Sequence, residues 1–233
     1  MKDAKTQEKL AAASGREERI ALAKERENKA EQNYKPIIIN PKRIVNNALN
    51  IIEHKLEGYD NIYVSEKVKL KPKQAYIINR DLNEAIKAYG GIKSLTKPKI
   101  SIVDDSEMGS FAIAKYDCVL NTIFALPQIG IPKEIVALQK GGACANNPKA
   151  TMYHEVWHWM QAEEYRRKHG EITAENRGEY MKWLIAKCKK ELDNNGLDEY
   201  NVDEICRYAG AIWRKNRFDE VDAEYNVSKK LRK

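Results

Sequence analysis

The chain reads Thr151-Met152-Tyr153-His154-Glu155-Val156-Trp157-His158-Trp159-Met160 about two thirds of the way along. On an α-helix, residues four apart project from the same face, so His154 and His158 can offer two imidazole nitrogens to one metal ion. Glu155 lies about 100° further round the helix, where it can reach a water on that metal but is poorly placed to be a ligand. The stretch therefore predicts a helical metal site with a carboxylate beside it.

The predicted helix has readable ends and two distinct faces. Asn147 followed by Pro148 is typical of an N-cap with proline at the first helical position, and Gly170 is a natural stop, so the helix is expected over 148–169. One face should bury against a core, and it carries Met152, Val156, Trp159 and Met160. The opposite face should border a cleft, and it carries His154, His158, Gln161 and Tyr165. The alternative is a helix whose two histidines are satisfied by ordinary neighbours.

Composition and cysteine spacing set the broad class. The chain has 233 residues, 42% hydrophobic and 32% charged, so one or two domains with a substantial core are expected. No stretch is long and apolar enough to span a membrane, and residues 1–33 lack the apolar segment of a secretory signal. The four cysteines are Cys118, Cys144, Cys188 and Cys206, and no two of them form a Cys-x-x-Cys pair. We therefore expect reduced thiols, no zinc finger and a cytoplasmic protein.

The charge distribution suggests three parts. Residues 1–33 mix both signs of charge without apolar periodicity, which predicts a helical or disordered arm. Residues 34–100 carry 13 Lys and Arg against 6 Asp and Glu, an excess of 7 that equals the whole net charge of +7. We expect a basic helix-strand-helix part over 34–97, followed by a further domain over 98–233. A series of lysines comprises Lys67, Lys69, Lys71 and Lys73. These side chains could contact phosphate or an acidic partner, although a solvated strand face is the simpler interpretation.

Hydrophobic periodicity predicts an α+β protein. Before the metal-binding helix, helices are expected over 41–56 and 73–89. Strands are expected over 62–70, 100–103, 110–114 and 119–126, the last two joined by a turn at 115–117. After the metal-binding helix, further helices are expected over 173–192, from a capping-box start at Asn201 to Trp213, and over 218–231.

The His-Glu-x-x-His stretch, with Thr151 leading it and uncharged residues around it, resembles the zincin metallopeptidases. The resemblance implies a zincin-like catalytic domain over 98–233, in which a small twisted sheet packs on the metal-binding helix and a mainly helical part follows. It also implies that the sheet edge bordering the cleft, within residues 110–126, pairs with an extended peptide substrate. An ordinary sheet edge is the alternative there.

The third ligand indicates which zincins the chain resembles. The metzincin pattern needs Gly and His where this chain has Gln161 and Glu164. The gluzincin pattern places a Glu on a later helix with an acid four residues on, and Glu220 with Glu224 matches it. This match departs from the pattern in having Glu for the usual Asp at the second position and a long insertion before it. The alternatives for the third ligand are Glu175 and Glu179, in an earlier helix.

The resemblance implies a zinc metallopeptidase that hydrolyses polypeptides. His154, His158 and Glu220 would bind Zn²⁺, Glu224 would orient a histidine, and Glu155 would act as general base on a zinc-bound water. Two tyrosines near the ligands are candidates for stabilising the oxyanion: Tyr180 and Tyr225.

Two other classes of function stay open. One is a zincin-fold protein that binds or assembles without cleaving, since residues 61–73 and 153–167 are similar to phage or prophage head-associated proteins; a phage-related assembly partner and a place in the virion would follow. The other is a nucleic-acid-binding module centred on the lysines of residues 67–73. The intact Glu155 favours a peptidase over a zincin-fold protein that does not cleave. The lack of a base-stacking motif weighs against a nucleic-acid-binding module.

Overall fold

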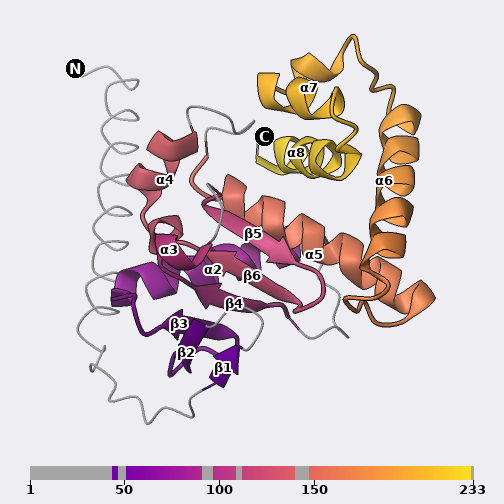
Figure 1. The fold of residues 1–233 in the computed structure, drawn as a ribbon. Coiled ribbons are helices and arrows are strands. Elements are labelled where there is room, and N and C mark those ends of the chain that lie inside the picture. Colours follow the sequence, from indigo (N-terminus) through magenta and orange to yellow (C-terminus); the bar gives the residue numbers. More distant parts are fainter. Residues whose placement is uncertain (1–43, 47–50, 91–96, 109–111, 140–146, 232–233) are drawn as a thin grey trace, which may run out of the picture. The chain divides into compact units, whose positions relative to one another are not determined.

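The computed structural model describes residues 44–46, 51–90, 97–108, 112–139 and 147–231 (Figure 1). All of them belong to one compact unit that spans Ile39–Lys233. The arm expected over residues 1–33 and the thiol of Cys144 lie outside the described residues. Within the described ranges, no helix combines the length and the apolar character needed to cross a membrane.

A six-stranded mixed sheet forms the middle of this unit, in the order β1-β2-β3-β4-β6-β5. Its strands are β1 Ile44–Asn46, β2 Ile51–Lys55, β3 Ile62–Ser65, β4 Lys99–Ile102, β5 Ala114–Asp117 and β6 Thr122–Ala125. The strands β3, β4 and β6 are parallel, whereas β2 is antiparallel to both neighbours and β5 is antiparallel to β6. The strand β5 therefore forms one edge of the sheet.

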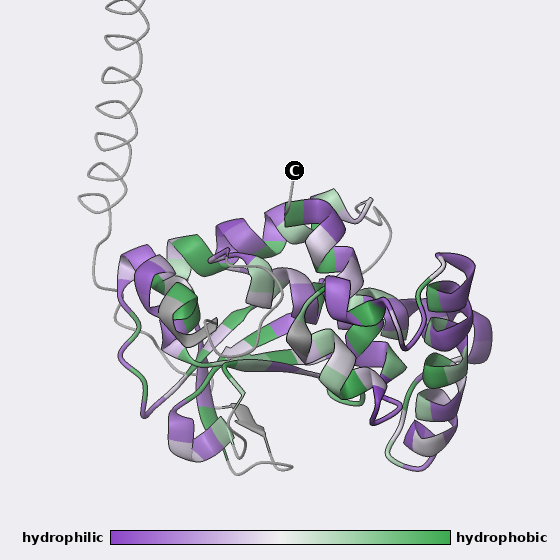
Figure 2. Cartoon of the chain, turned by 90° about the horizontal axis from the view of Figure 1, so that it is seen from above, coloured by the Kyte–Doolittle hydropathy of each residue, from purple (hydrophilic) through white to green (hydrophobic). Residues whose placement is uncertain are grey.

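One face of the sheet is covered by two long helices, α2 Pro72–Ala88 and α5 Ala150–His169. Side chains alternate between the two faces of a strand, and the register aligns apolar residues on this face: Ile62, Val64, Ile100, Ile102, Ile123 and Ala125. They join the buried faces of both helices in one core cluster. In Figure 2 hydrophobic colour gathers along the strands, and hydrophilic colour lies on the outward parts of the helices. The helix α5 therefore packs on the sheet through its predicted apolar face, which includes Met152, Val156 and Trp159.

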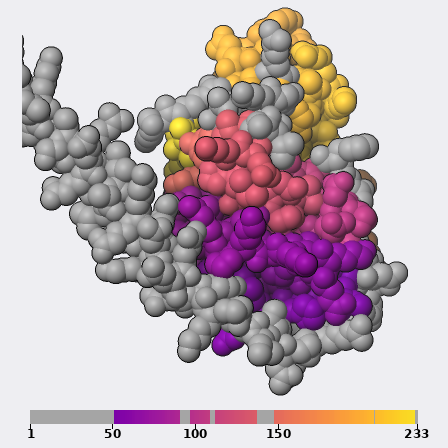
Figure 3. Space-filling model, turned by 90° about the vertical axis from the view of Figure 1, so that its left-hand side faces the viewer, coloured from indigo at the N-terminus to yellow at the C-terminus, as the bar shows by residue number. Residues whose placement is uncertain are grey.

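The C-terminal part is helical and has its own core. It contains α6 Arg177–Asn194, the short turn η2 Val202–Glu204, α7 Arg207–Trp213 and α8 Phe218–Leu231. The helix α8 packs on α5, α6 and α7, so it carries residues from the end of the chain onto α5 (Figure 1). Shorter elements complete the fold: α3 Asp105–Met108, η1 Pro127–Gly130 and α4 Pro132–Gln139. In Figure 3 the violet surface that begins at residue 51 lies at one end, and the orange surface of residues after α5 lies at the other.

The α+β class is confirmed, and so are most elements from residue 62 onward. The helices expected over 73–89, 148–169 and 218–231 are α2, α5 and α8, with small shifts at their ends. The helix expected over 173–192 begins later, at Arg177. The capping box expected at Asn201 opens only a 3₁₀ turn, and α7 starts after Cys206, whose sulfur accepts a hydrogen bond from the Ala209 amide at 3.3 Å.

Three expectations about the sheet were wrong. The helix predicted over 41–56 is instead the antiparallel pair β1 and β2, in a segment rich in β-branched residues that suit either period. The turn predicted at 115–117 lies inside β5, which pairs with β6, and the chain reverses at 118–121. The boundary predicted between residues 97 and 98 falls between β3 and β4, which pair in parallel. The two parts therefore share one sheet.

Two smaller expectations also differ. The lysine series follows the end of β3 at Ser65 and does not lie on a strand face: Lys67, Lys69 and Lys71 lie in the loop before α2, and Lys73 lies in the first turn of α2. There Lys67 lies 3.5 Å from a carboxylate oxygen of Glu107. The thiols of Cys118 and Cys188 are free and buried, as expected, whereas Cys206 is disulfide-bonded, which corrects the prediction that all four cysteines are reduced.

Candidate metal centre

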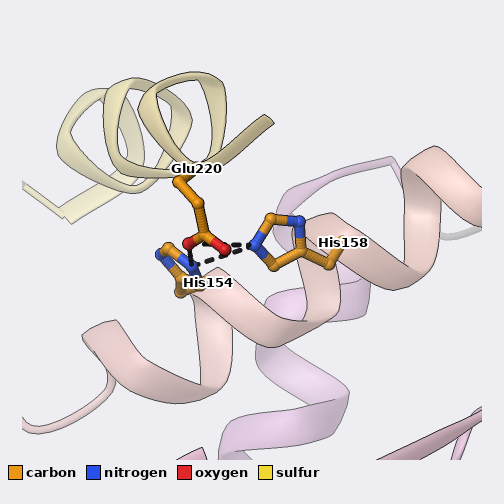
Figure 4. A group of neighbouring side chains, drawn as sticks. All are labelled: His154, His158 and Glu220. Atoms are coloured by element: carbon orange, nitrogen blue, oxygen red, sulfur yellow. Dashed lines mark hydrogen bonds and ion pairs between the residues drawn. The ribbon is translucent and has the colours of Figure 1, made fainter. Parts of the chain in front are cut away.

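Three side chains from two helices converge at one point. Both histidines project from α5, and Glu220 reaches them from the first turn of α8 (Figure 4). The Nε2 atom of His154 lies 3.0 Å from the Nε2 atom of His158 and 3.0 Å from Oε2 of Glu220. The His158 Nε2 atom lies 3.5 Å from the same carboxylate oxygen. All three ligand atoms lie within 4.8 Å of one another.

The far side of the His154 ring is fixed by a carboxylate. Its Nδ1 atom lies 3.0 Å from Oε1 of Glu224, a side chain that is only 8% exposed. A carboxylate can only accept, so the Nδ1 atom carries the proton of this contact. In a neutral ring the Nε2 atom then presents a lone pair to the cluster. Glu224 therefore fixes the orientation of the His154 ring from α8.

The far side of the His158 ring is fixed by an amide. Its Nδ1 atom lies 2.9 Å from Oε1 of Gln161, one turn along α5. The Gln161 amide is oriented in turn, because its Nε2 group donates to Oδ2 of Asp222 at 2.8 Å. The indole Nε1 of Trp157 donates to the same oxygen at 2.7 Å, and Asn226 donates to the other carboxylate oxygen at 3.1 Å. The amide oxygen of Gln161 therefore accepts from Nδ1, and the His158 Nε2 atom also presents a lone pair.

The centre of the cluster consequently holds three acceptors and no donor when both rings are neutral. Lone pairs that face one another at 3.0–3.5 Å repel unless a cation lies between them. Tetrahedral ligands at about 2.0–2.1 Å from a zinc ion lie roughly 3.4 Å apart, close to these spacings. Two imidazoles and one carboxylate also match the donor set of a catalytic zinc site. The residues therefore fit a divalent metal of the zinc type.

The charges of the metal-free cluster agree with this arrangement. Burial lowers the pKa of the His154 ring, but hydrogen bonds with Glu220 and Glu224 outweigh it and raise that pKa well above its ordinary value. For His158, Glu220 likewise outweighs burial and raises the pKa. Burial raises the pKa of Glu220, yet both histidines outweigh it and leave that pKa lowered. Without a metal, the cluster therefore favours binding protons.

Glu155 is buried beside the cluster, between α5 and the edge strand. Burial raises the pKa of its carboxyl, and the His154 and His158 rings offset part of this rise. A hydrogen bond with the Tyr116 backbone in β5 also lowers that pKa. The carboxyl lies outside the group of three ligand atoms but lines the same cavity. It is therefore placed to exchange protons with a molecule in the cavity.

The cluster opens into a cavity of about 510 Å³. One part of its wall comes from the sheet edge and the residues before it, from Ala112 to Tyr116, and another part comes from the start of α6. The predicted edge within residues 110–126 is thus β5, and it borders the cavity. The outer side of Glu220 is held by Arg217, whose guanidinium lies 2.7 Å from Oε1 and leaves Oε2 to the histidines.

The rival third ligands lie elsewhere. Glu175 and Glu179 are exposed and do not line the cavity. Glu164 pairs with Lys168 at 2.6 Å and with Lys187 at 3.2 Å, on the surface of α5 and α6. Among the described residues, His154, His158 and Glu220 are the only group with metal-ligand geometry.

The two tyrosines proposed as oxyanion stabilisers have different positions. Tyr180 lines the cavity but is buried among aromatic side chains, with its ring centroid 5.1 Å from that of Tyr165. Tyr225 does not line the cavity, because it projects from another face of α8 and its hydroxyl lies 3.2 Å from Asn195. The sequence missed Tyr208 of α7, which lines the cavity near Glu220.

Gln161 and Asp222 were also missed as parts of the site. Gln161 was placed on the correct helix face, but its bond to His158 was not predicted. A neutral amide has no metal-site signature of its own. The only available signal was its position three residues after a ligand, where side chains on a helix meet.

Comparison of the chain with protein-family models, with curated proteins and with solved structures found no match.

Proposed function

We propose that the chain is a zinc-dependent metallopeptidase of the zincin type, in which His154, His158 and Glu220 hold the metal. One observation carries the proposal: both imidazoles are bonded at Nδ1, so in their neutral form two Nε2 lone pairs and a carboxylate oxygen point at one another. A bound Zn²⁺ would supply Lewis-acid polarisation of a carbonyl and a lower pKa for a water molecule.

Glu155 is the general base of this proposal. Its carboxylate takes a proton from the attacking water as the water oxygen bonds to the peptide carbonyl carbon. It then gives that proton to the leaving nitrogen as the carbon–nitrogen bond breaks, so the base is regenerated. Burial and the bond to the Tyr116 backbone keep the carboxyl directed along the cavity wall.

The polypeptide substrate is inferred from the cavity wall. Among the described strands, β5 pairs with β6 alone, and its residues line the cavity beside the cluster. An extended peptide can add to such an edge through backbone hydrogen bonds, which require no particular side chains. This would place a peptide carbonyl next to the three ligands and Glu155.

Tyr208 is the side chain that we propose as the hydrogen-bond donor to the developing oxyanion. It lines the cavity on the side of Glu220 and His154 and is 37% exposed, so its hydroxyl can reach a ligand in the cavity. Tyr180 is only 2% exposed. Tyr208 therefore replaces Tyr180 and Tyr225 as the preferred candidate.

The first test measures metal content and peptidase activity together. The purified full chain should contain about one zinc per molecule and cleave members of a broad peptide library. Activity should disappear with a chelator and in Glu155→Gln, which keeps the shape but removes the base. Zinc content should be unchanged in that variant.

Glu179→Gln serves as the matched control, since this glutamate is exposed and lies outside the cavity. A folded protein without bound metal would refute the metal site. A protein that binds zinc but gives no cleavage with any peptide would favour the non-catalytic binding or assembly function.

A further inference from the structure

Arg177, the first residue of α6, differs from the other basic side chains of the cavity. Arg217 pairs with Asp219 at 3.1 Å and with Glu220 at 2.7 Å. The Nζ group of Lys115 donates to the backbone carbonyl of residue 108 at 2.7 Å. No carboxylate of the described ranges forms an ion pair with Arg177, although it lines the same cavity. Its guanidinium therefore offers all its donors to a ligand.

The position of Arg177 is set by one face of α6. The residues three, four and seven positions further along also line the cavity, namely Tyr180, Met181 and Leu184. These spacings are those of a single helix face. The charge of Arg177 also offsets part of the rise that burial causes in the pKa of the Cys118 thiol, so the guanidinium lies near the residue that follows β5. Arg177 thus lies at the end of the edge strand, beside an apolar wall.

Acidic side chains line another part of the cavity. Glu155, Glu220 and Glu224 line it, together with Asp219, whose charge is matched by Arg217. An anionic group on a ligand is attracted to the guanidinium of Arg177, which forms no ion pair with a carboxylate of the described residues. A planar carboxylate also matches the two parallel donors of an arginine.

We propose that Arg177 forms a subsite that binds a carboxylate of the peptide substrate, so that the enzyme favours peptides with a negative charge on that side of the cleaved bond. This inference rests on the proposed peptidase function and names its substrate class. The carboxylate comes either from an acidic side chain or from the C-terminus of the peptide. In both cases it sets the direction in which the peptide lies along β5, and the apolar wall of α6 accommodates the aliphatic part of the same residue.

Equilibrium binding tests the subsite without requiring cleavage. Four fluorescently labelled peptides of one parent sequence would combine an internal Glu or Gln with a free or amidated C-terminus. Their binding to the zinc-loaded Glu155→Gln protein would be measured by anisotropy. We expect at least one carboxylate to tighten binding about tenfold over the neutral peptide. The comparison between the two positions identifies the source of the carboxylate.

Substitution separates Arg177 from general electrostatics. In the Glu155→Gln background, Arg177→Gln should abolish the tenfold preference, whereas Arg167→Gln, an exposed position on α5 outside the cavity, should retain it. Arg177 is exposed, so the variant should fold, and its thermal unfolding is compared with that of the control. A preference that survives Arg177→Gln, equal binding of all four peptides, or no measurable binding would each overturn the subsite.

The two proposals fail in different ways. Arg177-dependent binding without cleavage by the wild-type protein would refute the peptidase and leave the carboxylate subsite intact. Cleavage of neutral and acidic peptides at equal rates, with equal binding, would refute the subsite and leave the peptidase intact.

Discussion

The two histidines of the cluster lie one turn apart on α5, yet they are held in different ways. His154 is held by the charged carboxylate of Glu224, directly from α8. His158 is held by the neutral amide of Gln161 on its own helix, and only the next partner, Asp222, comes from α8. A carboxylate increases the basicity of an imidazole, whereas an amide mainly orients it. The same ligand type therefore has two electronic environments within one site.

The largest effect is expected from removing the Glu220 carboxylate, which both histidines contact. Glu220→Ala deletes the carboxylate oxygen that lies 3.0 Å from His154 and 3.5 Å from His158. We expect zinc affinity to fall by roughly two or more orders of magnitude, since two imidazoles alone are an incomplete site. Competition titration with a zinc chelator measures this, with Glu179→Ala as the control that should behave like the wild type. The opposite ranking would show that Glu220 is not the third ligand.

A pair of variants separates the two supports. Glu224→Gln and Asp222→Asn each remove one charge and keep the shape of the side chain. We expect both to weaken zinc binding by about 10- to 100-fold, with the larger loss in Glu224→Gln, because this carboxylate contacts its histidine directly. The same chelator titration applies, and Lys229→Gln, at an exposed position of α8, is the control. Equal affinities in all three variants would contradict a supporting role for either acid.

The pH dependence of metal binding should follow the raised histidine pKa values. In the metal-free protein the pKa of both rings is raised above the ordinary histidine value of 6.5, so both rings stay protonated to a higher pH. Zinc must displace these protons, and its affinity should therefore increase as the pH rises above that value. For the same reason, the protonated rings stabilise the metal-free fold below that pH, and this contribution is lost as pH rises through the folded pKa values.

Calorimetry in buffers of different ionisation enthalpy counts the released protons. At pH values above the ordinary histidine pKa, Glu224→Gln should release fewer protons on zinc binding than the wild type does, because Glu224 helps to keep His154 protonated. An affinity independent of pH, with no proton release, would contradict the assignment of both histidines as ligands.

The smallest expected effect also concerns the His154 side. Tyr208→Phe should lower kcat by roughly tenfold with little change in KM, since the hydroxyl would act on the developing oxyanion rather than on the bound substrate. Tyr225→Phe should leave both constants unchanged, because that hydroxyl bonds Asn195 away from the cavity. Steady-state kinetics on one cleaved peptide gives both values. A change confined to KM would instead indicate that Tyr208 binds substrate.

The sequence by itself determined the parts of the site that depend on one helix. The spacing of His154 and His158 and the position of Glu155 follow from 3.6 residues per turn, and the end signals locate α5 within a few residues. The pair Glu220 and Glu224 was also recognisable, because an acid four residues after a ligand is again a property of one helix. The sequence could not bring the two helices together, since His154 and Glu220 are 66 residues apart.

Only the tertiary structure decided which side chains complete the site. Asp222 reaches Gln161, and Tyr208 reaches the cavity, because α7 and α8 pack against each other and α8 packs on α5. Neutral amides and tyrosines occur everywhere on helices, so no local pattern distinguishes these from the rest. The wrong prediction of a helix over residues 41–56 has the same physical cause. Apolar residues there fit a helical period, but strand pairing between β1 and β2 determines their structure. Local periodicity fixes which residues share a face, whereas the partner of that face is chosen by packing across the whole chain.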